Sequence, residues 1–188
     1  MKFENNILII GGTGFIGYHL AKKALEMGLD VTSISSNPPI KKRFLPKVKY
    51  IVCDITKKNK LKKCIQKPFK YVVNLGGYVD HSNKKKTFQS HYNGCKNLTE
   101  IFLKKLPIAF VQIGSSGEYG ALKSPQNESS KCNPKSIYGQ AKLLATKHLI
   151  QLYKKKKFPC TILRLYQVYG PYQDFNRFIP ITIKACIK

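Results

Sequence analysis

Three residues in the second half of the chain have the types and spacing that proton transfer needs. Ser115 follows a strand predicted at 108–113, and Tyr138 and Lys142 lie four residues apart near the start of a predicted helix. Residues four apart share one face of a helix, so the phenol and the ammonium group are neighbours. Because the serine hydroxyl lies at the carboxyl end of a strand, we expect the three to form a proton-transfer site.

A glycine-rich turn near the N-terminus predicts a second function, which is binding of a pyrophosphate. The apolar run Ile7 to Ile10 leads into glycines at 11, 14 and 17, and a helical pattern follows. A strand, a tight turn and a helix start direct backbone N–H groups and a helix dipole at phosphates. A structural turn that binds nothing is the alternative. The residues of this stretch expected to contact a dinucleotide are Gly11, Thr13, Gly14, Phe15, Ile16 and Gly17.

The end of the second predicted strand, 31–35, bears on which dinucleotide is bound. An acidic residue there would bind the ribose 2′-hydroxyl and select NAD. This chain has Ser35 and Ser36 instead, followed by the cations Lys41, Lys42 and Arg43. We therefore expect Ser35 and Arg43 at the ribose and a preference for NADP(H) over NAD. The alternative is that the cations belong to an ordinary lysine-rich surface.

Two further strand ends are expected to contact the cofactor. Asp54 and Ile55 close the strand predicted at 49–55, and the carboxylate can meet the adenine amino group. Leu75, Gly76 and Gly77 close the strand predicted at 71–75. Their small side chains would let the chain pass beneath the ribose and the nicotinamide. In the loop that follows, His81 is expected to be solvated surface rather than a catalytic acid.

Strand-like and helix-like patterns alternate along the chain without repeats or linkers. This alternation is typical of an α/β fold with a doubly wound parallel sheet, the Rossmann arrangement. We expect residues 1–170 to form the NAD(P)-binding domain and 171–188 to begin a substrate-binding region. The remaining predicted strands are 7–10 and 160–165, and the predicted helices start near 18, 57, 87 and 136, the third running to Leu106.

Composition excludes some classes of function and leaves others open. The 188 residues carry a net charge of +25, and lysines scattered over the whole chain supply most of it. This charge admits a nucleic-acid partner, but no basic motif is interleaved with aromatic residues, so we expect none. The six cysteines include no C-x-x-C pair and suggest no metal site. The sequence shows neither a membrane-span-length apolar run nor a signal peptide, so a cytoplasmic location is expected.

The order of these motifs resembles the extended short-chain dehydrogenase/reductase family, in its nucleotide-sugar epimerase/dehydratase branch. The resemblance implies that Tyr138 is the acid/base, that Lys142 stabilises it and holds the nicotinamide ribose, and that Ser115 bonds the reacting sugar oxygen. It also places Ser116, Gln167 and Arg177 at the substrate. The matching segments are Gly11 to Gly17, Asp54-Ile55, Ser115 to Gly120, Tyr138 to Lys142, Leu163-Arg164 and Val168 to Pro171.

The chain departs from the family pattern at several positions. Dehydratases of this branch carry an Asp-Glu pair where this chain has Ser116 and Gly117, which disfavours a 4,6-dehydratase. Glu118 follows one position later and is expected to point elsewhere. His91 and Gln167 stand where the family usually has asparagine. An epimerase or a 4-keto-sugar reductase remains; a non-catalytic dinucleotide-binding module and a basic nucleic-acid-associated protein are the alternatives.

Length is the other departure. Family members carry more chain after the Gly170-Pro171 turn, so the sequence is expected to be partial, with most of the substrate half missing and apolar surface left uncovered. Such a fragment would bind NADP(H) but turn over sugar nucleotide poorly or not at all. The longer form is expected to be a homodimer through the helices at 87–106 and 136–153.

Overall fold

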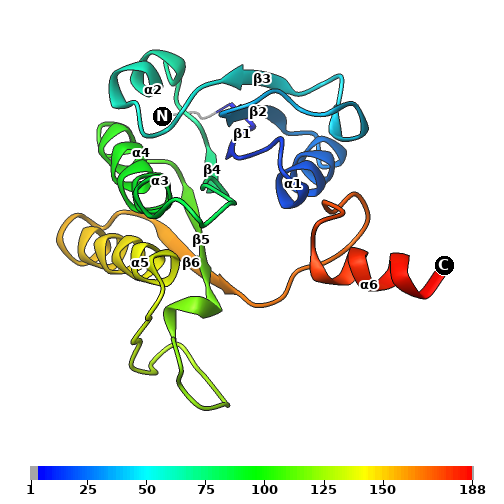
Figure 1. The fold of residues 1–188 in the computed structure, drawn as a ribbon. Helices are drawn as coiled ribbons and strands as arrows, with labels where there is room; N and C mark the ends of the chain where they lie inside the picture. Colours follow the sequence, from blue (N-terminus) through cyan, green and yellow to red (C-terminus); the bar gives the residue numbers. More distant parts are fainter. Residues whose placement is uncertain (1–3, 188) are drawn as a thin grey trace.

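The fold is a six-stranded parallel sheet with helices on both faces, in a computed structural model that describes residues 4–187 (Figure 1). Residues 1–3 of the predicted NAD(P)-binding domain and residue 188 of the predicted region 171–188 lie outside the described residues. The strand order is β3-β2-β1-β4-β5-β6, and every neighbouring pair is parallel. The predicted doubly wound Rossmann sheet is therefore confirmed. The strands are β1 (Asn6–Ile10), β2 (Asp30–Ser35), β3 (Lys49–Val52), β4 (Tyr71–Asn74), β5 (Ala109–Ser115) and β6 (Cys160–Leu165).

Two hydrophobic clusters hold the helices on the sheet. Successive side chains of β1 point to opposite faces, so Leu8 and Ile10 enter one cluster and Ile7 and Ile9 the other. Helices α2, α4 and α5 cover the first face, and α1 covers the second. The helical segments are α1 (Phe15–Glu26), η1 (Lys41–Arg43), α2 (Lys58–Cys64), α3 (Lys84–Phe88), η2 (Gln89–Asn93), α4 (Gly94–Phe102), η3 (Ser116–Glu118), α5 (Ile137–Lys156) and α6 (Phe178–Ile187).

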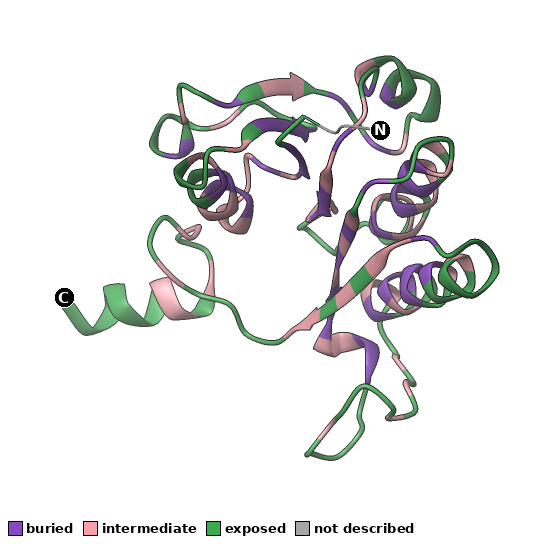
Figure 2. Ribbon diagram, turned by 180° about the vertical axis from the view of Figure 1, so that it is seen from behind, coloured by how far each residue is buried: buried purple, intermediate pink, exposed green. Residues whose placement is uncertain are grey.

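The sheet face over β6 is partly open in the described part of the chain. Burial along β6 alternates, and Leu163 is 44% exposed. Helix α6 has no buried residue, although Ile181 and Ile183 are apolar, and Figure 2 shows it projecting from the body of the molecule. This agrees with the expectation of uncovered apolar surface. Among the described helices, none combines the length and the apolar character that crossing a bilayer requires.

The single helix predicted from 87 to 106 is wrong in its continuity and in its end. A π-helical turn, η2, separates α3 from α4, and α4 ends at Phe102. Leu106, expected on the apolar face, is 39% exposed beyond the helix end. Pro107 disfavours helical backbone at the residue before it, which explains the early end. The third strand also stops short, at Val52, because the Asp54 carboxylate accepts a hydrogen bond from Thr56 N in a turn.

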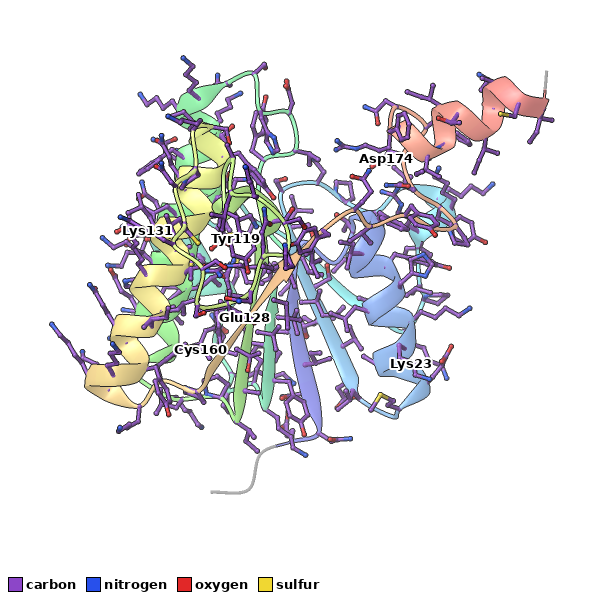
Figure 3. The ribbon with its side chains drawn as sticks, turned by 90° about the horizontal axis from the view of Figure 1, so that it is seen from below. Lys23, Tyr119, Glu128, Lys131, Cys160 and Asp174 are labelled. Carbon is purple, nitrogen blue, oxygen red and sulfur yellow. The ribbon has the colours of Figure 1, made fainter. Side chains whose placement is uncertain are left out.

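After β6 the chain returns across the sheet to α1, through residues 166–177, which we call the crossing segment (Figure 1). His19 Nε2 donates to Pro171 O over 2.9 Å, and the rings of Tyr18 and Tyr172 meet edge to face at 5.3 Å. Figure 3 places Asp174 on this segment, on the α1 side of the molecule. These contacts fix the crossing segment at the carboxyl ends of the strands, the edge where the predicted site residues lie.

Candidate active site

The glycine-rich turn between β1 and α1 has the geometry of a phosphate cradle. Gly11 has φ +81°, in the region that favours glycine, and a Cβ on Gly17 would overlap the Gly11 carbonyl oxygen. Helix α1 begins after Gly14 with no side-chain cap and no acidic residue in its first turn. Amides at such a helix start are left for an anionic ligand. The residues present therefore fit a dinucleotide pyrophosphate.

At the predicted ribose position, Ser35 and Arg43 are both held by other parts of the protein. Ser35 Oγ accepts a hydrogen bond from Thr13 N over 3.3 Å and so ties the phosphate turn to the end of β2. Arg43 is 5% exposed; its Nε donates to Tyr172 O over 3.1 Å, and its Nη2 pairs with Asp174 at 2.6 Å. The guanidinium thus anchors the crossing segment, and a 2′-phosphate would have to compete with Asp174 for it.

The other predicted cofactor contacts lie at the expected strand ends, and packing explains why two of them are glycines. Asp54 is exposed, whereas Ile55 is buried against Gly76 and Gly94. A Cβ on Gly77 would overlap the ring of His91. Gly76 and Gly77 are therefore required by neighbours inside the protein, whether or not a cofactor lies above them.

The structure places Tyr138 and Lys142 side by side at the start of α5. Lys142 is 4% exposed, its Nζ donates to Ile113 O over 2.7 Å, and the same nitrogen lies 5.7 Å from the centre of the Tyr138 ring. Burial lowers the pKa of Lys142 to about 8, against the opposing effect of the Glu118 carboxylate. This ammonium group is desolvated, so it acts strongly on charge that develops near the tyrosine.

Ser115 ends β5 and caps the short helix η3, which brings it to the same place. Its Oγ accepts a hydrogen bond from Gly117 N over 3.0 Å. A Cβ on Gly117 would lie 3.7 Å from the Tyr138 ring, and one on Gly139 would crowd the Gly117 carbonyl. The backbone of η3 therefore packs directly on the start of α5, and Ser116 lies half-buried on η3.

Glu118 points into the protein, as expected, and positions Ser115. Its carboxylate is fully buried and accepts hydrogen bonds from Ser115 N at 2.9 Å, Thr146 Oγ1 at 2.8 Å and Arg164 Nε at 3.1 Å. These donors come from β5, α5 and β6. One carboxylate thus fixes the serine relative to the helix that carries Tyr138.

His81 is the residue whose place the sequence did not predict. Its ring stacks on Tyr138, with centroids 4.2 Å apart and planes 20° from parallel. The contact joins the loop after β4 to α5, so no local sequence pattern could have indicated it. His81 is exposed, as expected, and the stacking on Tyr138 is an additional contact that the sequence did not indicate.

His91 is a second histidine against Tyr138, held by the π-helical turn η2. It is 6% exposed, meets the Tyr138 ring edge to face at 5.0 Å, and contacts Tyr78 O through Nε2 at 3.2 Å. A carbonyl only accepts, so Nε2 carries the hydrogen, and the buried Nδ1 has no partner among the described residues. Burial, with a smaller effect of the Lys142 cation, lowers the pKa of His91 to about 3.

A cavity of about 610 Å³ lies between the loop after β4 and the crossing segment. His81 and Arg177 are among its lining residues, so the structure brings the predicted substrate residue Arg177 near Tyr138 through His81. Gln167 is exposed and does not line it. A second hollow of about 520 Å³ lies over β6 and α5, where Figure 3 shows Tyr119 and Glu128, and shares no lining residue with the first. No group of three or more metal-ligating side chains occurs within residues 4–187.

Comparison with known proteins identifies the family. The family model described as "NAD dependent epimerase/dehydratase family" matches residues 7–188. The chain belongs to this family. A putative UDP-glucose 4-epimerase of Methanocaldococcus jannaschii is 30% identical over 177 residues, which cover 89% of this chain and 57% of the relative. The dTDP-D-glucose 4,6-dehydratase of Dictyostelium discoideum is also 30% identical, over 98% of this chain and 49% of its own.

Solved structures of family members share the fold. MoeE5 in complex with UDP-glucuronic acid and NAD superposes with a TM-score of 0.84 at 24% identity, over 96% of this chain and 60% of MoeE5. A UDP-galactose 4-epimerase superposes with a TM-score of 0.85 at 23% identity, over 97% of this chain and 62% of the epimerase. This epimerase/dehydratase chain thus spans about half to three fifths of the length of the proteins that it matches.

We predict that Glu118→Gln destabilises the protein by roughly 3 kcal/mol or more, because breaking one side of a buried ion pair leaves Arg164 uncompensated. Urea unfolding followed by circular dichroism measures the loss. Glu128→Gln, an exposed carboxylate in the neighbouring loop, is the matched control and should change stability by less than about 0.5 kcal/mol. Equal stabilities of the two variants would contradict the role given to Glu118.

The low pKa of His91 predicts that the protein loses stability in acid. The native pKa of about 3 lies below the ordinary 6.5, so below pH 6.5 the unfolded chain binds a proton that the native chain refuses. The free energy of unfolding therefore falls as the pH drops from 6.5 towards 3, by up to about 1.4 kcal/mol per pH unit. His91→Asn should lose less stability than wild type between about pH 6.5 and about pH 4.5 in urea titrations. Parallel losses would show that His91 does not set this dependence.

Proposed function

We propose that this chain is the cofactor-binding and proton-transferring part of a nucleotide-sugar epimerase or 4-keto-sugar reductase that uses NAD(P). The carrying observation is the buried Lys142 ammonium beside Tyr138, at the strand edge that also bears the phosphate cradle. Relatives named as UDP-glucose 4-epimerase and as dTDP-6-deoxy-L-talose 4-dehydrogenase (NAD(P)(+)) support this range of reactions.

In this proposal each residue acts on one proton or one charge. Tyr138 takes the proton of the sugar hydroxyl during oxidation and returns one during reduction. Lys142 stabilises the tyrosinate by its charge, and Ser115 hydrogen-bonds the same sugar oxygen. Hydride exchange with the sugar carbon is the chemistry that a bound nicotinamide would supply. Gly11 to Gly17 would hold the pyrophosphate, with Asp54 at the adenine and Leu75 to Gly77 beneath the ribose.

The proposed reaction type follows from the identity of the two residues after Ser115. Dehydration needs an acid and a base directly after that serine, and this chain has Ser116 and Gly117 there. Glu118 is bonded to Arg164 and Thr146 inside the protein and is not available to a substrate. We therefore propose epimerisation or keto reduction rather than dehydration. A homodimer through the helical stretches at 87–106 and 136–153 and a cytoplasmic location stay predictions.

The cofactor preference is a separate proposal. The expected preference for NADP(H) depended on the absence of a carboxylate at Ser35 and Ser36 and on the cations at 41–43, and Arg43 is bound to Tyr172 and Asp174. The neighbouring MoeE5 structures were solved with NAD. We propose that NAD(H) binds at least as well as NADP(H), since Arg43 is bound to the crossing segment and Lys42 Nζ lies 4.9 Å from the centre of the Phe175 ring in the same segment.

Fluorescence titration with NADH tests the proposed site. Wild type and Tyr138→Phe should bind alike, and Gly17→Val should lose binding because its side chain would displace the Gly11 carbonyl. In a form of the protein that shows turnover of a sugar nucleotide, Tyr138→Phe should abolish that turnover. Unchanged turnover would reject the acid/base role, whereas binding without turnover in wild type would favour the non-catalytic dinucleotide-binding module.

Arg43→Ala tests the cofactor preference. We expect NADH and NADPH affinities to fall together, by less than about tenfold, because the crossing segment loosens while no 2′-phosphate contact is lost. The matched variant Lys41→Ala with Lys42→Ala should weaken NADPH more than NADH. A selective loss of NADPH binding in Arg43→Ala would instead support its predicted role at the 2′-phosphate.

A further inference from the structure

His81 lies between the reacting tyrosine and the cavity beside it. One face of its ring covers Tyr138 at 4.2 Å, and the same side chain lines the 610 Å³ cavity. A cavity of this size is within the range that holds a small organic ligand. A ligand in this cavity would therefore meet His81 directly next to the phenol that is proposed to exchange its proton.

The cavity has one cation, Arg177, which forms no ion pair with a side chain of residues 4–187. Arg177 reaches it from the crossing segment and makes no side-chain hydrogen bond or ion pair with residues 4–187. Of the cavity's two acidic lining residues, only Asp174 is paired with a cation, and the Asp80 carboxylate keeps its charge. Asp174 pairs with Arg43, and Asp80 accepts hydrogen bonds from Ser82 N at 3.1 Å and Tyr78 Oη at 3.3 Å.

The groups around His81 make its surroundings electropositive. Burial lowers the pKa of His81, and the cations of Arg177 and Lys142 lower it further, whereas Asp80 raises it. His91, the other histidine at 6.0 Å, is kept neutral by its own burial. A bound anion would oppose the two cations, so anion binding and protonation of His81 would favour each other.

We propose that His81 and Arg177 form a carboxylate-binding subsite beside Tyr138, and that the sugar of the nucleotide-sugar substrate is a uronic acid. This inference rests on the proposed function. The argument for a sugar carboxylate is position: Tyr138 would act on a ring hydroxyl, so a group that touches Tyr138 meets the sugar ring. In a hexuronic acid the carboxylate is borne by the ring carbon next to C4, and a guanidinium binds a carboxylate through two parallel N–H groups.

The nucleotide diphosphate is the other anion that this subsite accepts on charge alone, and the choice of probes separates the two. With the protein saturated in NAD, UDP-glucuronate, UDP-glucose and UDP are titrated while the imidazole C–H signals are followed by NMR. His81→Asn assigns the His81 signal. UDP-glucuronate should bind at least about tenfold more tightly than UDP-glucose, which is 1.4 kcal/mol, and should alone raise the pKa of His81. Equal affinities, or the same His81 shift with UDP, would overturn the inference.

Two variants and one control separate binding from packing. His81→Phe keeps an aromatic ring on Tyr138, and Arg177→Gln keeps a polar side chain that donates hydrogen bonds while removing the charge. Each should bring the affinity ratio of UDP-glucuronate to UDP-glucose close to 1. Lys184→Gln removes an exposed cation from α6 and should leave the ratio unchanged. A ratio that survives His81→Phe and Arg177→Gln would overturn the subsite.

The pH dependence adds a measurement that a purely structural histidine would not affect. Affinity for UDP-glucuronate should rise as the pH falls from about 7.5 to about 6, because protonation of His81 accompanies binding, and His81→Phe should abolish the rise. NADH binding without any preference for UDP-glucuronate would reject this subsite and leave the proposed function in place. Absence of NADH binding would reject the proposed function itself.

Discussion

The burial of one ammonium group is the constraint on which the site depends. Lys142 is enclosed between β5 and α5, and the lowering of its pKa from 10.5 to about 8 corresponds to about 3 kcal/mol against the charged form. This cost applies below about pH 8 and disappears as the pH rises towards 10.5. The fold retains the group because Ile113 O accepts its hydrogen bond and the Glu118 carboxylate opposes its desolvation. A charge held this way needs no water to reorganise when charge develops on a neighbouring group.

Glu118 connects this constraint to the rest of the sheet. Its carboxylate joins the carboxyl ends of β5 and β6 to the side of α5. The serine, the tyrosine and the lysine are therefore fixed relative to one another by one buried ion pair and its hydrogen bonds. Glu118, which follows the positions of the dehydratase Asp-Glu pair in the sequence, is therefore part of the scaffold that holds the site. Its burial also explains Gly114, where a Cβ would crowd the carboxylate at 2.6 Å.

The crossing segment joins the two ends of the site. Arg43, at the end nearest the predicted ribose position, holds Asp174, while Arg177 from the same segment lines the cavity beside His81. Arg43, which the sequence suggests for a phosphate, instead holds Asp174 in the wall of the cavity beside His81. The region of the predicted ribose position and the cavity beside His81 therefore contact the same short stretch of chain, which also supplies Arg177 to the cavity.

The sequence by itself determined the parallel sheet, the phosphate turn and the Tyr138–Lys142 pair, because each is encoded by local periodicity or by spacing along one helix. Only the tertiary structure decided the positions of His81 and His91 around Tyr138, the capture of Arg43 by Asp174, and the π-helical turn that interrupts the predicted long helix. Each of these depends on contacts between elements far apart in the chain. Such contacts are set by packing and by the competition among buried polar groups, which no local pattern of residues records.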